Sequence, residues 1–121
     1  MKRLFASILM VSFALSAQVF IEGVDINQLD DVQYCEVWGE QKTLSWKVRL
    51  FVDYGQKQST AEEPHSFVAA GKDGKKLNFH SIMHALNFMY KNGWEYVEAF
   101  PLSSGVGKNK IYHFMLRRVK H

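Results

Sequence analysis

The stretch SIMHALNFMYKNGWEYVEAF, residues 81–100, decides the fold, because it joins a helix, a stop signal and a strand. An apolar stripe recurs there at helical spacing, formed by Ile82, Ala85, Leu86 and Met89. Ser81 is a good N-cap, and Asn92 followed by Gly93 is a good stop, because glycine accepts the left-handed conformation that ends helices. The pattern predicts a helix from Ser81 to Asn92 and a strand over residues 94–100.

Alternating apolar and polar residues predict the strands around this helix. The clearest strand runs from Leu44 to Tyr54, with Phe51 as the one exception to the alternation, and it forms a hairpin with residues 34–38. Its dry face is expected to comprise Leu44, Trp46, Val48, Leu50, Val52 and Tyr54. A tight turn at Asp73-Gly74 and further strands are expected over residues 67–70, 76–79 and 110–120. One helix among antiparallel strands predicts an α+β fold, with the helix packed on one face of an antiparallel sheet.

The first seventeen residues have the organisation of a secretory signal peptide. Lys2 and Arg3 provide a cationic start, an apolar run follows, and small residues precede a cleavage point near Ala17. A membrane anchor or a first core helix is the alternative, but a spanning helix needs about 20 apolar residues. We expect residues 1–17 to be a cleavable signal helix and residues 18–121 to be a single domain. The mature protein is expected to be secreted or periplasmic, without stable membrane insertion.

Charge is balanced overall but divided along the chain. Removal of the leader leaves 13 basic and 12 acidic residues, so the sequence predicts no nucleic-acid partner. Residues 18–40 carry six acidic side chains and no Lys or Arg, whereas residues 99–121 carry five basic side chains and no acid. If the first and last strands are neighbours, these charges pair across the sheet. The alternative is that the basic end contacts a lipid headgroup, an anionic glycan or the acidic patch of a partner.

A single cysteine, Cys35, excludes an internal disulfide. Its place in an alternating, strand-like segment predicts a buried small hydrophobic side chain. An intermolecular disulfide and a nucleophilic thiol are the alternatives.

The helix-to-strand junction also carries a family resemblance. The matching segments are Ala85-Leu86-Asn87 through Gly93-Trp94-Glu95-Tyr96-Val97, the final strand from Tyr112-His113, and residues 52–56 and 73–76. Together they resemble a domain-of-unknown-function family of small secreted bacterial proteins. The resemblance spans most of the mature chain and implies the fold and a secreted location, but no established activity and no catalytic residues. Structural roles are assigned to Ser81, Asn87, Gly93 and Trp94.

His84 departs from the family pattern, which has an acid at this position. An acid three residues after the N-cap completes a capping box and interacts favourably with the helix dipole. We therefore expect either a weaker helix start or another role for His84.

Candidate chemical sites are few. His80 and His84 are four residues apart, but the first lies outside the predicted helix, so no metal site is predicted. Residues 105–108, GVGK, lack the first glycine of a P-loop. Glu95 and Glu98 point to opposite faces of a strand. No catalytic, cofactor-binding or metal-binding residue is assigned.

Aromatic residues are numerous for so small a core, which indicates that some of them form a surface. The candidate interaction surface comprises Phe88, on the expected outer side of the helix, with Tyr112, Phe114, Arg117 and Arg118. We expect an exported, non-catalytic binding or protein-interaction module. Its partner is a second copy in a homodimer, another protein or a glycan.

An enzyme is the less favoured alternative. It would be a small hydrolase or metal-dependent enzyme built on His84, His113 and a carboxylate. A pocket that gathers histidines and carboxylates would favour this alternative, and a flat aromatic patch would favour binding.

Overall fold

The computed structural model describes residues 18–42, 44–57, 67–103 and 110–119. The predicted signal peptide and the GVGK segment lie outside the described residues. No helix in the described part of the chain is long and apolar enough to cross a membrane.

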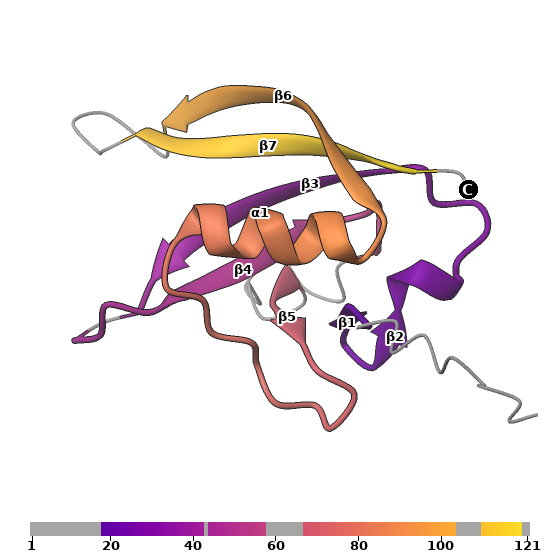
Figure 1. Ribbon diagram of the computed structural model, residues 1–121, viewed down its shortest axis with the longest axis horizontal. Coiled ribbons are helices and arrows are strands. Elements are labelled where there is room, and N and C mark those ends of the chain that lie inside the picture. The colour runs from indigo at the N-terminus through magenta and orange to yellow at the C-terminus, as the bar shows by residue number, and fades with distance from the viewer. Residues whose placement is uncertain (1–17, 43, 58–66, 104–109, 120–121) are drawn as a thin grey trace, which may run out of the picture.

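Two antiparallel sheets and one α-helix make up the described fold (Figure 1). In chain order the elements are β1 (Phe20–Ile21), β2 (Val24–Asp25), the 3-10 helix η1 (Ile26–Gln28), β3 (Tyr34–Gln41), β4 (Val48–Asp53), β5 (Ala69–Ala70), α1 (Ile82–Lys91), β6 (Trp94–Ser103) and β7 (Lys110–Arg118). The larger sheet has the order β4-β3-β7-β6, and the smaller one has the order β2-β1-β5. Helix α1 packs on one face of the larger sheet. The predicted α+β class with antiparallel strands is confirmed.

Local signals set the limits of α1 as predicted. The Ser81 hydroxyl accepts a hydrogen bond from the His84 N–H at 3.1 Å, so Ser81 is the N-cap. At the other end, the Asn92 N–H donates to the Met89 carbonyl at 3.0 Å. Gly93 follows with a φ of +88°, a left-handed conformation that suits glycine.

The core lies between α1 and the larger sheet and extends to the smaller sheet and η1. Its fully buried side chains include Val37, Leu50, Val52, Ala85, Met89, Trp94 and Leu116. Trp94 is 1% exposed, and its indole N–H donates to the Asn27 side chain at 2.8 Å, which ties β6 to η1. Trp94 therefore contributes both to the core and to the attachment of η1. Asn87 lies exposed on α1, so burial does not account for the role assigned to it.

The predicted strand from Leu44 to Tyr54 is wrong in its first four residues, because β4 begins at Val48. Residues 44–47 form a tight loop instead, closed by a hydrogen bond from the Lys42 N–H to the Lys47 carbonyl at 3.0 Å. Leu44 has a φ of +60°, which a strand cannot accommodate. The alternation of apolar residues therefore extends beyond the strand into a loop.

The face of β4 expected to be wet is also partly buried. Leu50 and Val52 face the core as predicted, but Phe51 is buried on the opposite face, where its ring stacks on Trp38 with centroids 5.5 Å apart.

The turn at Asp73-Gly74 is present. The Gly71 N–H donates to the Lys75 carbonyl at 2.9 Å, and Gly74 has a φ of +80°. The flanking strands are shorter than predicted, because Phe79 pairs with Val48 of β4 and not with the other arm of the turn.

Candidate functional site

An open apolar cleft of about 570 Å³ lies at one end of the larger sheet. At this end the β3–β4 and β6–β7 hairpins both reach past the first turn of α1, on the left of Figure 1. Its walls include Trp46, Val48, Ile82, Tyr112 and Phe114. We call it the end cleft.

The end cleft forms because two neighbouring strands stop pairing before they end. The register between β3 and β7 ends at Trp38 opposite His113, although β3 continues to Gln41 and β7 begins at Lys110. Phe114, opposite the buried Val37, faces the same side of the sheet as α1. Tyr112, two residues before Phe114, faces that side as well and projects where the sheet opens.

Gly39 sets the floor of the end cleft. A Cβ atom at Gly39 would lie 2.8 Å from Val48 Cγ1 and 3.1 Å from Ile82 Cδ1. Only a residue without a side chain therefore allows the first turn of α1 to pack this closely on β3.

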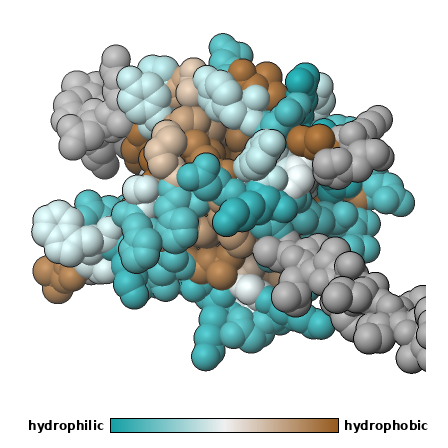
Figure 2. Space-filling model, in the orientation of Figure 1, coloured by the Kyte–Doolittle hydropathy of each residue, from teal (hydrophilic) through white to brown (hydrophobic). Residues whose placement is uncertain are grey.

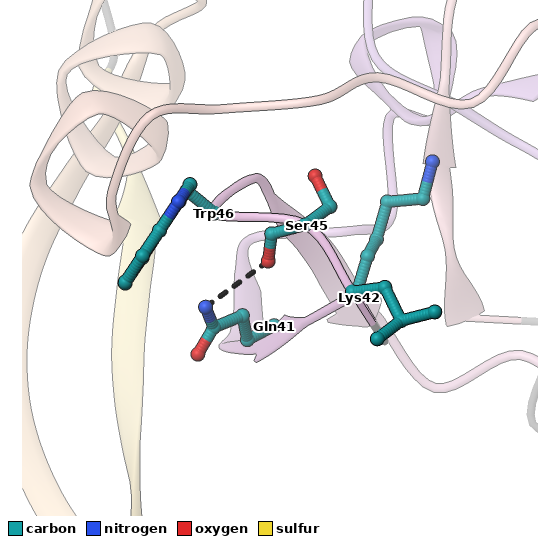
Figure 3. A pocket seen from close by; sticks show the side chains of 5 residues that line it. Gln41, Lys42, Ser45 and Trp46 are labelled. Carbon is teal, nitrogen blue, oxygen red and sulfur yellow. Dashed lines mark hydrogen bonds between the residues drawn. The ribbon is translucent and has the colours of Figure 1, made fainter.

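Exposed aromatic side chains form the rim. Trp46 is 90% exposed and Tyr112 is 58% exposed. Figure 3 shows that Trp46 and Lys42 project on opposite sides of the 42–47 loop, and that the Gln41 side-chain amide donates to the Ser45 carbonyl at 3.0 Å. This bond ties the loop that carries Trp46 to the end of β3.

The polar groups at the helix start are engaged with one another. While the Ser81 hydroxyl accepts from the His84 N–H, the His84 Nδ1 accepts from the His80 N–H at 3.0 Å. The two imidazole rings stack with centroids 5.0 Å apart. His84 thus provides a side-chain acceptor near the helix start, much as the acid of a capping box does.

A row of stacked rings crosses the helix-free face of the larger sheet. Trp38 lies between Phe51 at 5.5 Å and His113 at 4.7 Å, and His113 in turn lies 6.0 Å from Phe100. His113 Nδ1 lies 2.5 Å from a Glu36 carboxylate oxygen. All of these side chains are half-buried or buried, so the row packs within the fold more than it projects from it.

The structure does not assemble the histidines proposed for an enzyme. His113 is on the helix-free face, whereas His84 belongs to α1 and contacts the ring of Phe79. Within the described ranges, no three His, Cys, Asp or Glu side chains gather as metal ligands.

The five residues of the expected interaction surface lie in different places. Tyr112 and Phe114 meet in the end cleft. Phe88 is half-buried against Phe79, with ring centroids 5.2 Å apart, so it does not lie on an exposed outer side of the helix. Arg117 pairs with Glu95.

Arg118 has a structural role instead. Its guanidinium donates to the carbonyls of Leu29 at 2.8 Å and Ile26 at 2.6 Å, and it lies over the Trp94 ring at 5.1 Å. The basic C-terminal strand and part of the acidic segment of residues 18–40 do lie side by side, because β7 pairs with β3. The described ion pairs are nevertheless few, and Arg118 bonds carbonyls and not acids.

Cys35 is buried in the core, as predicted. Burial raises the pKa of its thiol to about 12. The thiol is therefore protonated at neutral pH, and a nucleophilic role is disfavoured.

Both edges of the larger sheet are protected against strand addition. The edge of β4 is bridged by Val68 and Phe79. The edge of β6 is interrupted by a bulge between Tyr96 and Glu98 and by Pro101, which has no N–H to donate.

Sequence reasoning missed Trp46, which was expected on the dry face of a strand. The signal that could have found it is the polar run of residues 39–42, continued by Ser45 and Lys47, which is typical of a loop.

Comparisons of the chain with protein-family models, with curated proteins and with solved structures find no match.

Proposed function

We propose that this protein is an exported, non-catalytic binding module and that its end cleft receives an apolar group of the partner. The observation that carries the proposal is the convergence of Trp46, Tyr112 and Phe114, from a loop and a strand, on an open cleft of about 570 Å³. This volume is in the range of sites that bind small molecules or single side chains, about 300–1,000 Å³.

Aromatic side chains at the rim support binding in physical terms. A buried aromatic side chain removes roughly 150–250 Å² from water and keeps a rigid shape, which makes it an effective anchor. In the free protein Trp46 exposes most of its surface and Tyr112 more than half. A ligand between them would bury this area, and the rigid rings would lose little conformational entropy.

The polar groups at the cleft favour recognition over chemistry. His80 and Ser81 line it, but the Ser81 hydroxyl caps α1 by accepting from the His84 N–H, and the His80 imidazole stacks on the His84 ring. A nucleophile needs an adjacent base that is free to take its proton. The hydrolase alternative retains one supporting observation, the Glu36–His113 pair, because a carboxylate that orients a histidine recurs in hydrolases.

The end cleft can be tested with an apolar probe. The purified ¹⁵N-labelled protein is titrated with 8-anilinonaphthalene-1-sulfonate and followed by NMR. We expect amide shifts to cluster on Gly39, Val48, Ile82 and Tyr112. Loss of one aromatic wall in Tyr112→Ser should weaken binding about tenfold, equivalent to about 1.4 kcal/mol.

Tyr90→Ser is the matched control, since Tyr90 is 67% exposed on α1 and does not line the cleft. Equal affinity of the two variants, or shifts centred away from the cleft, would contradict the proposal. Turnover of a panel of p-nitrophenyl esters that disappears in Glu36→Gln would favour the hydrolase instead.

A further inference from the structure

We propose that the tip of the β3–β4 hairpin, residues 42 and 44–47, docks on the surface of an anionic lipid bilayer. This goes beyond the end cleft, because Leu44 and Lys47 do not line that cleft. We call these residues the tip.

The tip holds two apolar side chains almost completely in water. Leu44 is fully exposed and Trp46 is 90% exposed, and no other large apolar side chain among the described residues exceeds the 67% of Tyr90. The β3–β4 hairpin ends at the left of Figure 1, and Figure 2 shows brown and white surface at the same end of the molecule. Scattered surface apolar residues are ordinary, but two at the end of one projecting loop indicate a surface that becomes buried.

Backbone strain at Leu44 supports the same conclusion. Its φ of +60° is a conformation that glycine or asparagine adopts far more readily than leucine. The loop is held in this shape by hydrogen bonds from the Ser45 N–H to the Lys42 carbonyl at 3.2 Å and from the Lys47 N–H to the Ser45 hydroxyl at 3.2 Å. A loop that only reversed the chain would not need leucine here, so the strain points to a role for its side chain.

The positive charge of the tip indicates an anionic partner. Lys42 and Lys47 bracket the two apolar residues, and no acidic residue lies between them. The hydrogen bond between their backbones places them opposite each other at the base of the tip. The nearest acid in the hairpin, Glu40, stands opposite Arg49 in the register. An anionic headgroup layer complements this pair of cations while the apolar side chains enter the interface.

The shape of the tip favours a lipid surface over a protein partner. A stable protein interface buries about 800 Å² on each side, whereas the tip offers two side chains on a narrow loop. A tryptophan and lysines on one exposed loop are also a typical combination at membrane interfaces, because the indole has an apolar body and a polar N–H, and the long lysine side chains extend their amines to the headgroups.

Vesicle binding tests the proposal. The purified protein is mixed with vesicles of phosphatidylcholine and phosphatidylglycerol at 3:1, or of phosphatidylcholine alone, and binding is measured by flotation and by tryptophan emission. We expect a blue shift dominated by Trp46, because Trp94 is buried and Trp38 is half-buried. Two lysines near an anionic surface predict a roughly 30-fold preference for the anionic vesicles at low salt.

Leu44→Gly is the decisive variant, since glycine suits the observed φ and leaves the fold intact while it removes the apolar side chain. We expect it to weaken vesicle binding at least about fivefold, since burial of a leucine side chain is lost. Lys42→Gln combined with Lys47→Gln should abolish the preference for anionic lipid. Tyr90→Ser, a matched exposed residue on α1, should change nothing.

Tyr112→Ser separates the two proposals, because it impairs the end cleft without touching the tip. Vesicle binding that persists in Tyr112→Ser but is lost in Leu44→Gly supports lipid docking even if the end cleft binds nothing. No binding to either vesicle, equal binding to both, or unchanged binding by Leu44→Gly would overturn it. Saturable binding of the tip to a protein in place of lipid would also overturn the proposal.

Discussion

Gly39→Ala should destabilise the protein by about 1–2 kcal/mol. The new Cβ would lie 2.8 Å from Val48 Cγ1 and 3.1 Å from Ile82 Cδ1, whereas carbon atoms pack best at about 3.5–4.0 Å. Inserting a methyl group into such a contact costs roughly 1–3 kcal/mol. Gly39 has no positive φ, so alanine can adopt its backbone conformation. Alanine also restricts the unfolded chain more than glycine does, which stabilises the folded protein by about 0.4–1 kcal/mol and offsets part of the cost. Urea unfolding followed by tryptophan fluorescence measures the balance.

A double-mutant cycle with Val48→Ala tests the cause. Val48→Ala removes the Cγ1 atom that the new Cβ would meet, so Gly39→Ala should cost about 1 kcal/mol less in that background. The reasoning is refuted if Gly39→Ala raises the free energy of unfolding, or if its cost is the same in both backgrounds.

Substitutions at three further residues test the roles of single side chains. Arg118→Met leaves two carbonyls without their charged donor and should cost about 2–4 kcal/mol in urea unfolding, with Arg118→Lys intermediate because an ammonium cannot span both. Cys35 should resist Ellman's reagent at pH 8 until the protein is unfolded. The pKa of the folded Cys35 thiol, about 12, lies above its ordinary value of 9.0. The buried thiol therefore contributes fully to stability below pH 9, and this contribution is lost as the pH rises toward 12. The loss should be absent in Cys35→Ala. In thermal unfolding, His84→Ala should cost about 0.5–1.5 kcal/mol, whereas His84→Glu should be at least as stable as the native protein; a less stable His84→Glu would contradict the capping role.

The predicted export has its own measurement. In a secreting host, the mature protein should begin at Gln18, and intact-mass spectrometry would detect this. Retention of residues 1–17 would contradict the signal-peptide prediction.

Elements whose signals are local were predicted well. The helix start depends on a hydrogen bond between Ser81 and His84, and the helix end depends on the conformation of Gly93. Both signals act within three residues, so the sequence contains all of the interacting groups. The α+β class followed, because it needs only the type and order of the elements.

Elements that depend on distant partners were predicted poorly. The alternation from Leu44 to Tyr54 could not reveal that its first residues form a loop, because pairing with β3 decides where β4 begins. Phe51 seemed misplaced in the pattern, yet it is buried by Trp38 on the opposite face. Neither the register nor the ring contact is encoded in periodicity.

The candidate site shows the same division. The sequence alone predicted the helix with its caps, the burial of Cys35 and the leader. It also placed two residues of the end cleft, Tyr112 and Phe114, in the candidate interaction surface. Only the tertiary structure decided that Trp46 joins them at an exposed rim, that Phe88 packs inward and that Arg118 holds the segment around η1. The physical reason is that a side chain's neighbours along the chain determine its backbone conformation, whereas the strands and helices that fold against it determine whether it is buried, paired or available to a partner.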